Sequence, residues 1–223
     1  MSEIHWDERA LEAKNPIKAG PEVSIIKEFV MRLQPKKILE IGMNYGRELK
    51  ELEGLAELYG VDSNKNMIDA AKNYVHGKFE TGDACKLPYR SPRFDFVYTD
   101  GVLSHIDPEC VYEAISEAIR VSKNYILIVE YLGTRQGRNT ISNCKKFTWV
   151  HDYDKLLSTQ NVIIQYKQTV FFGSDMYYIA LLQKLKFFRI EKSEEGAVET
   201  VVVPEEKKHR FEIKIGKHKW GIG

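Results

Sequence analysis

Residues 37–46 read KILEIGMNYG, an apolar run that carries one glutamate and ends in a turn with two glycines. The apolar residues favour a buried strand. From Arg47 onward, leucine recurs at positions 49, 52 and 55, and this spacing places the three side chains on one face of a helix. The stretch therefore predicts a strand, a tight turn and a helix in direct succession.

The turn at Gly42 and Gly46 has the properties of a ligand site. Glycine lets the backbone turn tightly and approach a ligand closely, and the start of a helix favours an anion or a carboxylate. The spacing is Glu-x-Gly-x-x-x-Gly, which differs from the Gly-x-Gly-x-x-Gly of pyrophosphate-binding folds. Glu40 would repel a pyrophosphate but attract an ammonium. An ordinary turn with two chance glycines is the alternative that this motif alone leaves open.

Three further runs end in polar or glycine-containing segments. The first ends at Asp62, and an acid at this distance from the glycine turn accepts hydrogen bonds from ribose hydroxyls in nucleoside-binding α/β folds. The second, at residues 78–81, leads into the turn Gly82-Asp83-Ala84. The third, at residues 94–100, is followed by Gly-Val-Leu-Ser-His-Ile. Because ligands gather at the carboxyl ends of parallel strands, we expect one site there.

These four motifs, in this order, resemble those of the class I S-adenosylmethionine-dependent methyltransferases, in the branch that acts on small molecules. The resemblance covers residues 36–185 and implies S-adenosyl-L-methionine as the cofactor, since this molecule carries both an ammonium and a carboxylate. In the family, the position of Met67 packs on the adenine and that of Asp83 accepts from its amino group. The cofactor-binding residues implied are Glu40, Gly42, Asn44, Tyr45, Gly46, Arg47, Asp62, Ser63, Met67, Asp83, Ala84, Asp100 and Gly101. A core methionine is the alternative for Met67.

The resemblance also implies the architecture. We expect an α/β fold with a Rossmann-like, doubly wound, seven-stranded sheet, mostly parallel with an antiparallel last strand, plus a C-terminal β extension. Residues 1–35 would form a capping segment and a helix, residues 36–185 the methyltransferase domain, and residues 186–223 an appended β-hairpin. Within the domain, apolar periodicity predicts a helix at 108–121 and strands at 125–130, 162–172 and 176–185.

Composition restricts the class of protein. The chain has 223 residues, of which 43% are hydrophobic, so it can bury a core. With 33 basic and 32 acidic residues, it has no overall charge that would attract nucleic acid. The three cysteines, Cys85, Cys110 and Cys144, fit neither a disulfide framework nor a paired zinc site, so we expect a reducing cytoplasm and no metal. Neither a signal peptide nor a bilayer-spanning run is found. The C-terminal extension, residues 186–223, could support a homodimer.

Methyl transfer to a hydroxyl also needs a base to remove the proton. His105 is the candidate, because it follows the fourth strand and histidine titrates near neutral pH. A histidine that bonds its own loop or packs on the cofactor is the alternative. His151 with Asp152 is the second candidate base, and Tyr131 is the third. Arg135 and Arg138 could bind a carboxylate or phosphate of the acceptor, or they could be solvated surface charges. Trp6 could cover the cofactor, or it could fill a hydrophobic gap.

A finer likeness concerns the acceptor. Residues 120–131, RVSKNYILIVEY, with Lys145-Lys146-Phe147 and Trp6, resemble methylases associated with pseudaminic acid biosynthesis. This implies a hydroxyl of a sugar or sugar nucleotide as the acceptor, although the chain departs from that group after Tyr131 and in its C-terminal extension. Two other functions remain open: a methyltransferase-like binding or scaffold protein without turnover, and an NAD-dependent sugar enzyme. Glu40 and the missing second glycine disfavour the latter.

Overall fold

The computed structural model describes residues 20–90, 92–134, 149–173 and 175–185. The strands are β1 Lys37–Ile41, β2 Glu57–Asp62, β3 Lys78–Thr81, β4 Phe94–Asp100, β5 Ser122–Thr134, β6 Val162–Phe172 and β7 Asp175–Lys184. The helices are α2 Glu22–Leu33, α3 Arg47–Lys50, α4 Lys65–Tyr74, α5 Val111–Val121 and α6 Tyr153–Ser158, with a 3-10 helix η1 at Leu103–His105. Trp6, Arg135, Arg138, Cys144 and the predicted hairpin at 186–223 lie outside the described residues.

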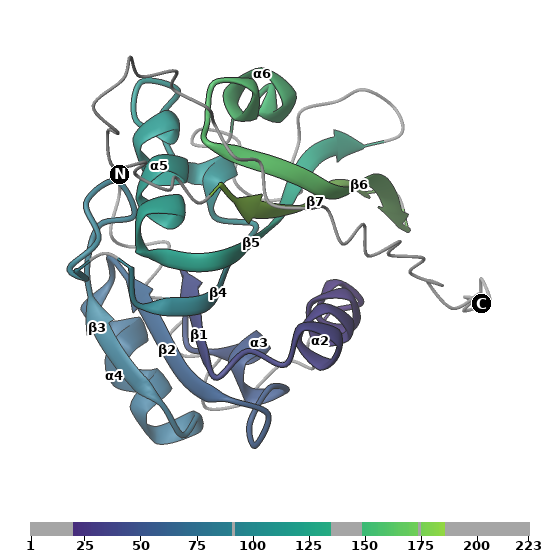
Figure 1. Ribbon diagram of the computed structural model, residues 1–223. Helices are drawn as coiled ribbons and strands as arrows, with labels where there is room; N and C mark the ends of the chain where they lie inside the picture. The colour runs from purple at the N-terminus through teal and green to yellow at the C-terminus, as the bar shows by residue number, and fades with distance from the viewer. Residues whose placement is uncertain (1–19, 91, 135–148, 174, 186–223) are drawn as a thin grey trace, which may run out of the picture.

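The seven strands form one sheet in the order β3-β2-β1-β4-β5-β7-β6 (Figure 1). Strands β1 to β5 pair in parallel, whereas β7 runs antiparallel to β5 and to β6. This confirms the prediction of a doubly wound α/β sheet with an antiparallel last strand. The order of the strands reverses between β1 and β4, and sheets of this kind bind ligands in the crevice at such a reversal.

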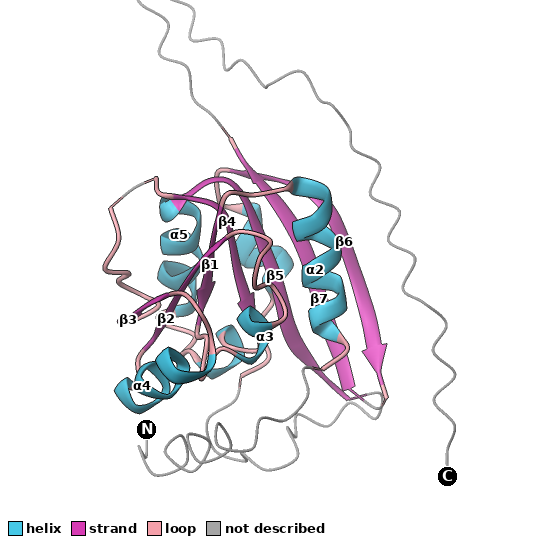
Figure 2. Cartoon of the chain, turned by 90° about the horizontal axis from the view of Figure 1, so that it is seen from below, coloured by secondary structure: helices cyan, strands magenta, loops and turns pink. Residues whose placement is uncertain are grey.

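Helices cover both faces of the sheet (Figures 1 and 2). On one face, α5 and α6 pack against a cluster that includes Ile126 and Ile128 of β5. On the other face, α2, α3 and α4 pack against a cluster that includes Leu127 and Val129. Alternate residues of one strand thus enter opposite cores, which is why the central strands are continuous apolar runs.

The helix predicted after the glycine turn is much shorter than its leucine spacing suggested. Helix α3 ends at Lys50, and residues 51–55 form turns that place Gly54 at φ +81°. Leu49 and Leu52 are fully buried, but Leu55 is 43% exposed. The third leucine therefore does not extend the buried face, and the prediction of one helix through all three was wrong.

Two other elements differ from the prediction in length. Helix α5 begins at Val111, because residues 107–110 form a turn in which the Asp107 carbonyl accepts from Cys110 at 2.8 Å. Strand β5 extends beyond the predicted 125–130 to Thr134, because it pairs along its length with β7 as far as Asp175.

Cys85 and Cys110 form a disulfide, with their Cα atoms 6.3 Å apart. This contradicts the prediction of unpaired cysteines, which rested on their number and spacing. The loop after β3 and the start of α5 meet in space although 25 positions separate the two cysteines. The compartment expected from the number and spacing of the cysteines stays a prediction. Among the described helices, none combines the length and the apolar character that crossing a bilayer requires.

Candidate active site

The glycine turn joins the end of β1 to α3. Gly42 and Gly46 have φ values of +73° and +83°, and Asn44 between them is also left-handed at +53°. Asparagine tolerates this region better than most residues with a side chain. The N–H groups of Gly42 and Met43 donate to the Val61 carbonyl at 2.8 and 3.1 Å, so the turn is tied to the end of β2.

Asp62 ends β2 and binds the same turn. Its Oδ2 accepts from the Asn44 N–H at 2.8 Å, and its Oδ1 accepts from the Asn64 N–H at 2.9 Å. Burial raises the pKa of this carboxyl, although both hydrogen bonds lower it. Each oxygen has a further lone pair and the residue is only partly buried, so Asp62 can also accept from hydroxyl groups of a ligand.

Glu40 lies inside the protein and is 2% exposed. The Tyr98 hydroxyl donates to its Oε2 at 2.9 Å. Burial, followed by the nearby Glu48 carboxylate, raises the pKa of Glu40 well above its ordinary value. The carboxyl that we expected to meet an ammonium is thus already paired with a tyrosine within the core.

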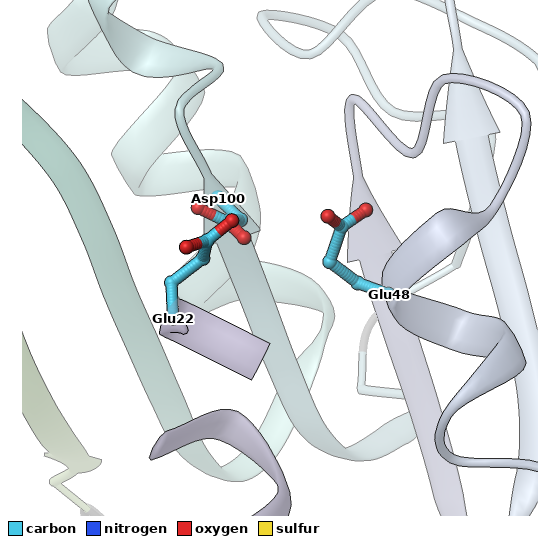
Figure 3. Close-up of side chains that lie close together, drawn as sticks. All are labelled: Glu22, Glu48 and Asp100. Carbon is cyan, nitrogen blue, oxygen red and sulfur yellow. The ribbon is translucent and has the colours of Figure 1, made fainter. Parts of the chain in front are cut away.

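Three other carboxyl groups meet beside the turn. Glu22 begins α2, Glu48 lies in α3 and Asp100 ends β4, and the groups point toward one another (Figure 3). One oxygen from each lies within 4.8 Å of the other two. The Arg47 guanidinium is 2.5 Å from Glu48 and 3.4 Å from Glu22. The Oδ2 atom of Asp100 is buried and has no hydrogen-bond partner.

Glu22, Glu48 and Asp100 form an acidic cluster with Arg47. Burial and nearby charges shift the pKa of Glu22, Arg47 and Asp100. Burial raises the pKa of Asp100 well above its ordinary value, and the carboxylates of Glu48 and Glu22 raise it further. Burial also raises the pKa of Glu22. Burial alone would lower the pKa of Arg47, but Glu48 and Glu22 outweigh this and raise it. A ligand with positive charge would favour the ionised form of these carboxyls.

The loop after β3 carries Asp83 and Ala84. Asp83 is exposed, and its Oδ1 accepts from the Cys85 N–H at 2.8 Å. Ala84 is partly buried and packs against the core on the α5 face. The disulfide from Cys85 to Cys110 fastens this loop to the segment that precedes α5.

The loop after β4, residues 101–106, lies directly on the glycine turn. A Cβ atom added to Gly42 would lie 2.2 Å from Cγ2 of Val102, so the valine occupies the space above the glycine. His105 follows on η1 and is partly buried. The carboxyl ends of β1, β2 and β4 thus bring Gly42, Asp62 and Asp100 to one edge with the loop that carries His105.

A family model matches the part of the chain that carries this edge. Residues 39–127 match the model of a methyltransferase domain, and the matched segment includes the glycine turn, Asp62, Asp83, Asp100 and His105. The chain carries a class I S-adenosylmethionine-dependent methyltransferase domain. The matched domain is therefore one that transfers methyl groups from this cofactor.

Solved structures share the fold of the methyltransferase domain at low sequence identity. A TehB-like SAM-dependent methyltransferase from Corynebacterium glutamicum is 19% identical, with a TM-score of 0.62 over 81% of this chain and 98% of its own. Magnesium protoporphyrin IX methyltransferase from Synechocystis PCC 6803 with bound SAM is 16% identical, with a TM-score of 0.58 over 82% and 85%. The [4+2]-cyclase SpnF is 14% identical, with a TM-score of 0.61 over 73% and 79%. The comparison with curated proteins gave no match.

The residues of the methyltransferase domain fit the cofactor. S-Adenosylmethionine combines a sulfonium, an ammonium and a carboxylate, so it carries net positive charge. The buried, unpartnered Oδ2 of Asp100 is an acceptor that such a cation would satisfy. The acidic cluster also holds three carboxyls against the one guanidinium of Arg47, so an added cation would balance its charge.

Three other residues predicted to bind the cofactor differ in how far their side chains are exposed. Ser63 is exposed beside Asp62, whereas Met67 is 1% exposed on α4. The Tyr45 ring is buried and packs edge to face on Tyr74, with ring centres 5.7 Å apart. The backbone of Tyr45 can therefore line the turn, but its ring belongs to the core.

Sequence reasoning missed four acidic or hydroxyl groups at this edge, namely Glu22, Glu48, Tyr98 and Glu130. Glu22 and Glu48 approach Asp100 only in the folded chain, so no local pattern marks them. Glu130 could have been singled out, because it is an acid at the end of a continuous apolar strand. It is fully buried, and burial raises its pKa to about 7 although hydrogen bonds from backbone N–H groups lower it.

A cavity of about 340 Å³ opens at the start of α6, between this helix and strands β6 and β7. The Tyr178 hydroxyl donates to Asp154 at 2.8 Å, and the Lys167 ammonium lies 3.0 Å from the same carboxylate. The lining residues are Leu132, His151, Asp152, Tyr153, Asp154, Lys167, Gln168, Thr169 and Tyr178. The cavity is therefore lined mainly by groups that form hydrogen bonds.

Proposed function

We propose that this enzyme binds S-adenosylmethionine across the carboxyl ends of β1, β2 and β4 and methylates a hydroxyl of a small molecule. The unpartnered Oδ2 of Asp100, within an excess of carboxyls, carries this proposal, because a cation is the ligand that this surrounding stabilises. Asp62 would accept from the ribose hydroxyls, and Asp83, Ala84 and Met67 would hold the adenine.

The protein's own contribution to the reaction would be alignment and proton removal. The cofactor, when bound, supplies a methyl group that is already activated on a sulfonium. The loop of residues 101–106 would set the edge at which the acceptor approaches, and correct alignment can account for much of the rate. His105, carried on η1, would take the proton of the acceptor hydroxyl.

Sugars and sugar nucleotides are the acceptors that we propose to test first. Their many hydroxyls match the carboxylate, amide, lysine and hydroxyl groups of the cavity at the start of α6. The likeness of residues 120–131 to pseudaminic acid methylases supports the same class. Its support is independent of the cavity, because most of the cavity lining comes from later in the chain.

Calorimetric titration tests the cofactor site. We expect the protein to bind S-adenosylmethionine and its demethylated product, and Asp62→Ala to weaken both by about tenfold or more because a ribose acceptor and the anchor of the turn are lost. Asp69→Ala, on the exposed side of α4, is the matched control and should bind as the wild type does. Absence of binding at millimolar cofactor, or tight binding of NAD instead, would refute the proposal.

A second experiment concerns the base. On any acceptor found with labelled cofactor, His105→Ala should lower kcat about a hundredfold while cofactor affinity stays within about threefold. His76→Ala, an exposed histidine in the turn after α4, serves as the control. An equal loss of affinity and turnover would show that His105 only shapes the cofactor pocket.

A cofactor-binding protein without turnover is the alternative outcome. The structural likeness to a [4+2]-cyclase supports this alternative, because that protein has the same fold but is named for a reaction other than methyl transfer. Cofactor binding without methylation of any acceptor in the screen would support this alternative.

A further inference from the structure

The carbonyl groups of the loop after β4 are held by the segment that precedes α6. The Nε2 atom of His151 lies 2.9 Å from the Leu103 carbonyl and 3.1 Å from the Ile106 carbonyl. Because carbonyl oxygens only accept, Nε2 must carry the proton and donate to both. The Trp149 N–H donates to the Ser104 carbonyl at 2.8 Å. Three carbonyls in or next to η1 are thus satisfied by two neighbouring residues.

The N–H groups of the same loop face a carboxylate from β5. The Ser104 N–H donates to Oε2 of Glu130 at 3.3 Å. Burial raises the pKa of this carboxyl to about 7, while the N–H groups of Leu103, Ser104 and Val102 oppose that rise. Glu130 and Ser104 are both fully buried, so water does not compete for the hydrogen bond between them.

The loop held in this way touches both parts of the proposed reaction site. At its start, Val102 fills the space above Gly42 of the glycine turn. At its end, η1 carries His105. A displacement of the loop would therefore move Val102 away from the glycine turn and would shift the proposed base at the same time.

We infer that Glu130 and His151 are positioning residues that clamp the loop of residues 101–106, one through a backbone N–H and the other through backbone carbonyls, and so align the methyl acceptor with the cofactor. Neither residue is required to touch a reacting atom: Glu130 accepts from the Ser104 N–H, and His151 donates to the Leu103 and Ile106 carbonyls. The effect on turnover rests on the proposed function, but the clamp itself does not. Misplacement of catalytic groups by about 1 Å can cost about a hundredfold in rate, which is the scale on which such residues act.

Paired substitutions separate the hydrogen bonds from the packing. Glu130→Leu and His151→Phe keep a side chain of similar size but remove the acceptor or the donor. Glu130→Gln keeps an oxygen that can accept from Ser104, and His151→Gln keeps an N–H that can reach the carbonyls. The exposed residues Glu113 and His76 supply the controls Glu113→Leu and His76→Phe.

Hydrogen exchange of the cofactor-free protein, read by mass spectrometry on a peptide that covers residues 100–107, reports on the clamp directly. We expect exchange to quicken by about tenfold or more in Glu130→Leu and His151→Phe, and to stay near the wild-type rate in both glutamine variants and both controls. Exchange unchanged in His151→Phe, or changed equally across the whole chain, would overturn the inference. If Glu130→Leu does not fold, the comparison of His151→Phe with His151→Gln tests the inference.

Kinetics then test the consequence for catalysis. In Glu130→Leu and His151→Phe, kcat should fall by about tenfold or more, beyond any loss of cofactor affinity, and the glutamine variants should recover to within about threefold. If kcat does not recover in the glutamine variants, the hydrogen bonds of Glu130 and His151 are not what these side chains contribute to turnover. A wild type that binds no cofactor would refute the proposed function, while the exchange result would still stand for the clamp.

Discussion

Gly42→Ala is expected to lower the free energy of unfolding by about 3 kcal/mol and to abolish measurable cofactor binding. Two costs add at this position. An alanine would have to keep the left-handed φ of +73°, and its Cβ would lie 2.2 Å from Cγ2 and 2.6 Å from Cβ of Val102. The second distance involves an atom next to the backbone, so the loop after β4 would have to move. Urea unfolding and calorimetric titration measure the two effects.

The chain offers a matched control for the backbone cost. Gly54 has a φ of +81°, but a Cβ there would meet nothing within 4 Å. Gly54→Ala should therefore cost only about 1 kcal/mol and leave cofactor binding intact. Val102→Ala added to Gly42→Ala should restore part of the lost stability, because it removes the clash. Equal destabilisation by both alanine substitutions would show that Val102 does not constrain the turn.

The strands of the sheet could be predicted because each corresponds to a recognisable local pattern in the sequence. Strands β1 and β4 are buried on both faces, and such strands read as continuous apolar runs. The acid at the end of β2 and the glycines of the turn stand at positions set by the backbone itself. The predicted edge of the sheet was accordingly confirmed in its topology, while the roles of the residues at that edge stay predictions.

Features that arise from contacts between distant segments could not be predicted. The acidic cluster joins three separate elements, and the disulfide joins two loops whose approach depends on the packing of α5. The short α3 has a similar cause, since the leucine spacing was compatible with a helix but Leu55 has no core to enter. Glu40 illustrates the reverse case: its position in the motif was clear, but its pairing with Tyr98 of a neighbouring strand was not visible.

Glu130→Gln is expected to change how stability depends on pH. Burial raises the pKa of Glu130 from 4.5 to about 7, so between these values the folded protein keeps a proton that the unfolded chain has lost. The contribution of Glu130 to stability is therefore greatest at low pH and falls as pH rises through this window. For one group with this shift, the loss is about 3 kcal/mol between pH 4.5 and pH 8. A glutamine does not titrate, so the variant should gain about that much relative to the wild type over the same range.

Urea unfolding at a series of pH values measures this difference. The wild type contains other carboxyls with raised pKa, among them Glu40 and Asp100, and the variant retains both. Besides burial, the charge of Glu130 raises the pKa of Tyr153 of α6 and of Asp100 of β4, and both groups remain in the variant. The exposed substitution Glu113→Gln on α5 should follow the wild type at every pH. A Glu130→Gln curve parallel to the wild type would mean that water or a rearranged loop reaches the carboxylate, so that its ionisation no longer opposes folding.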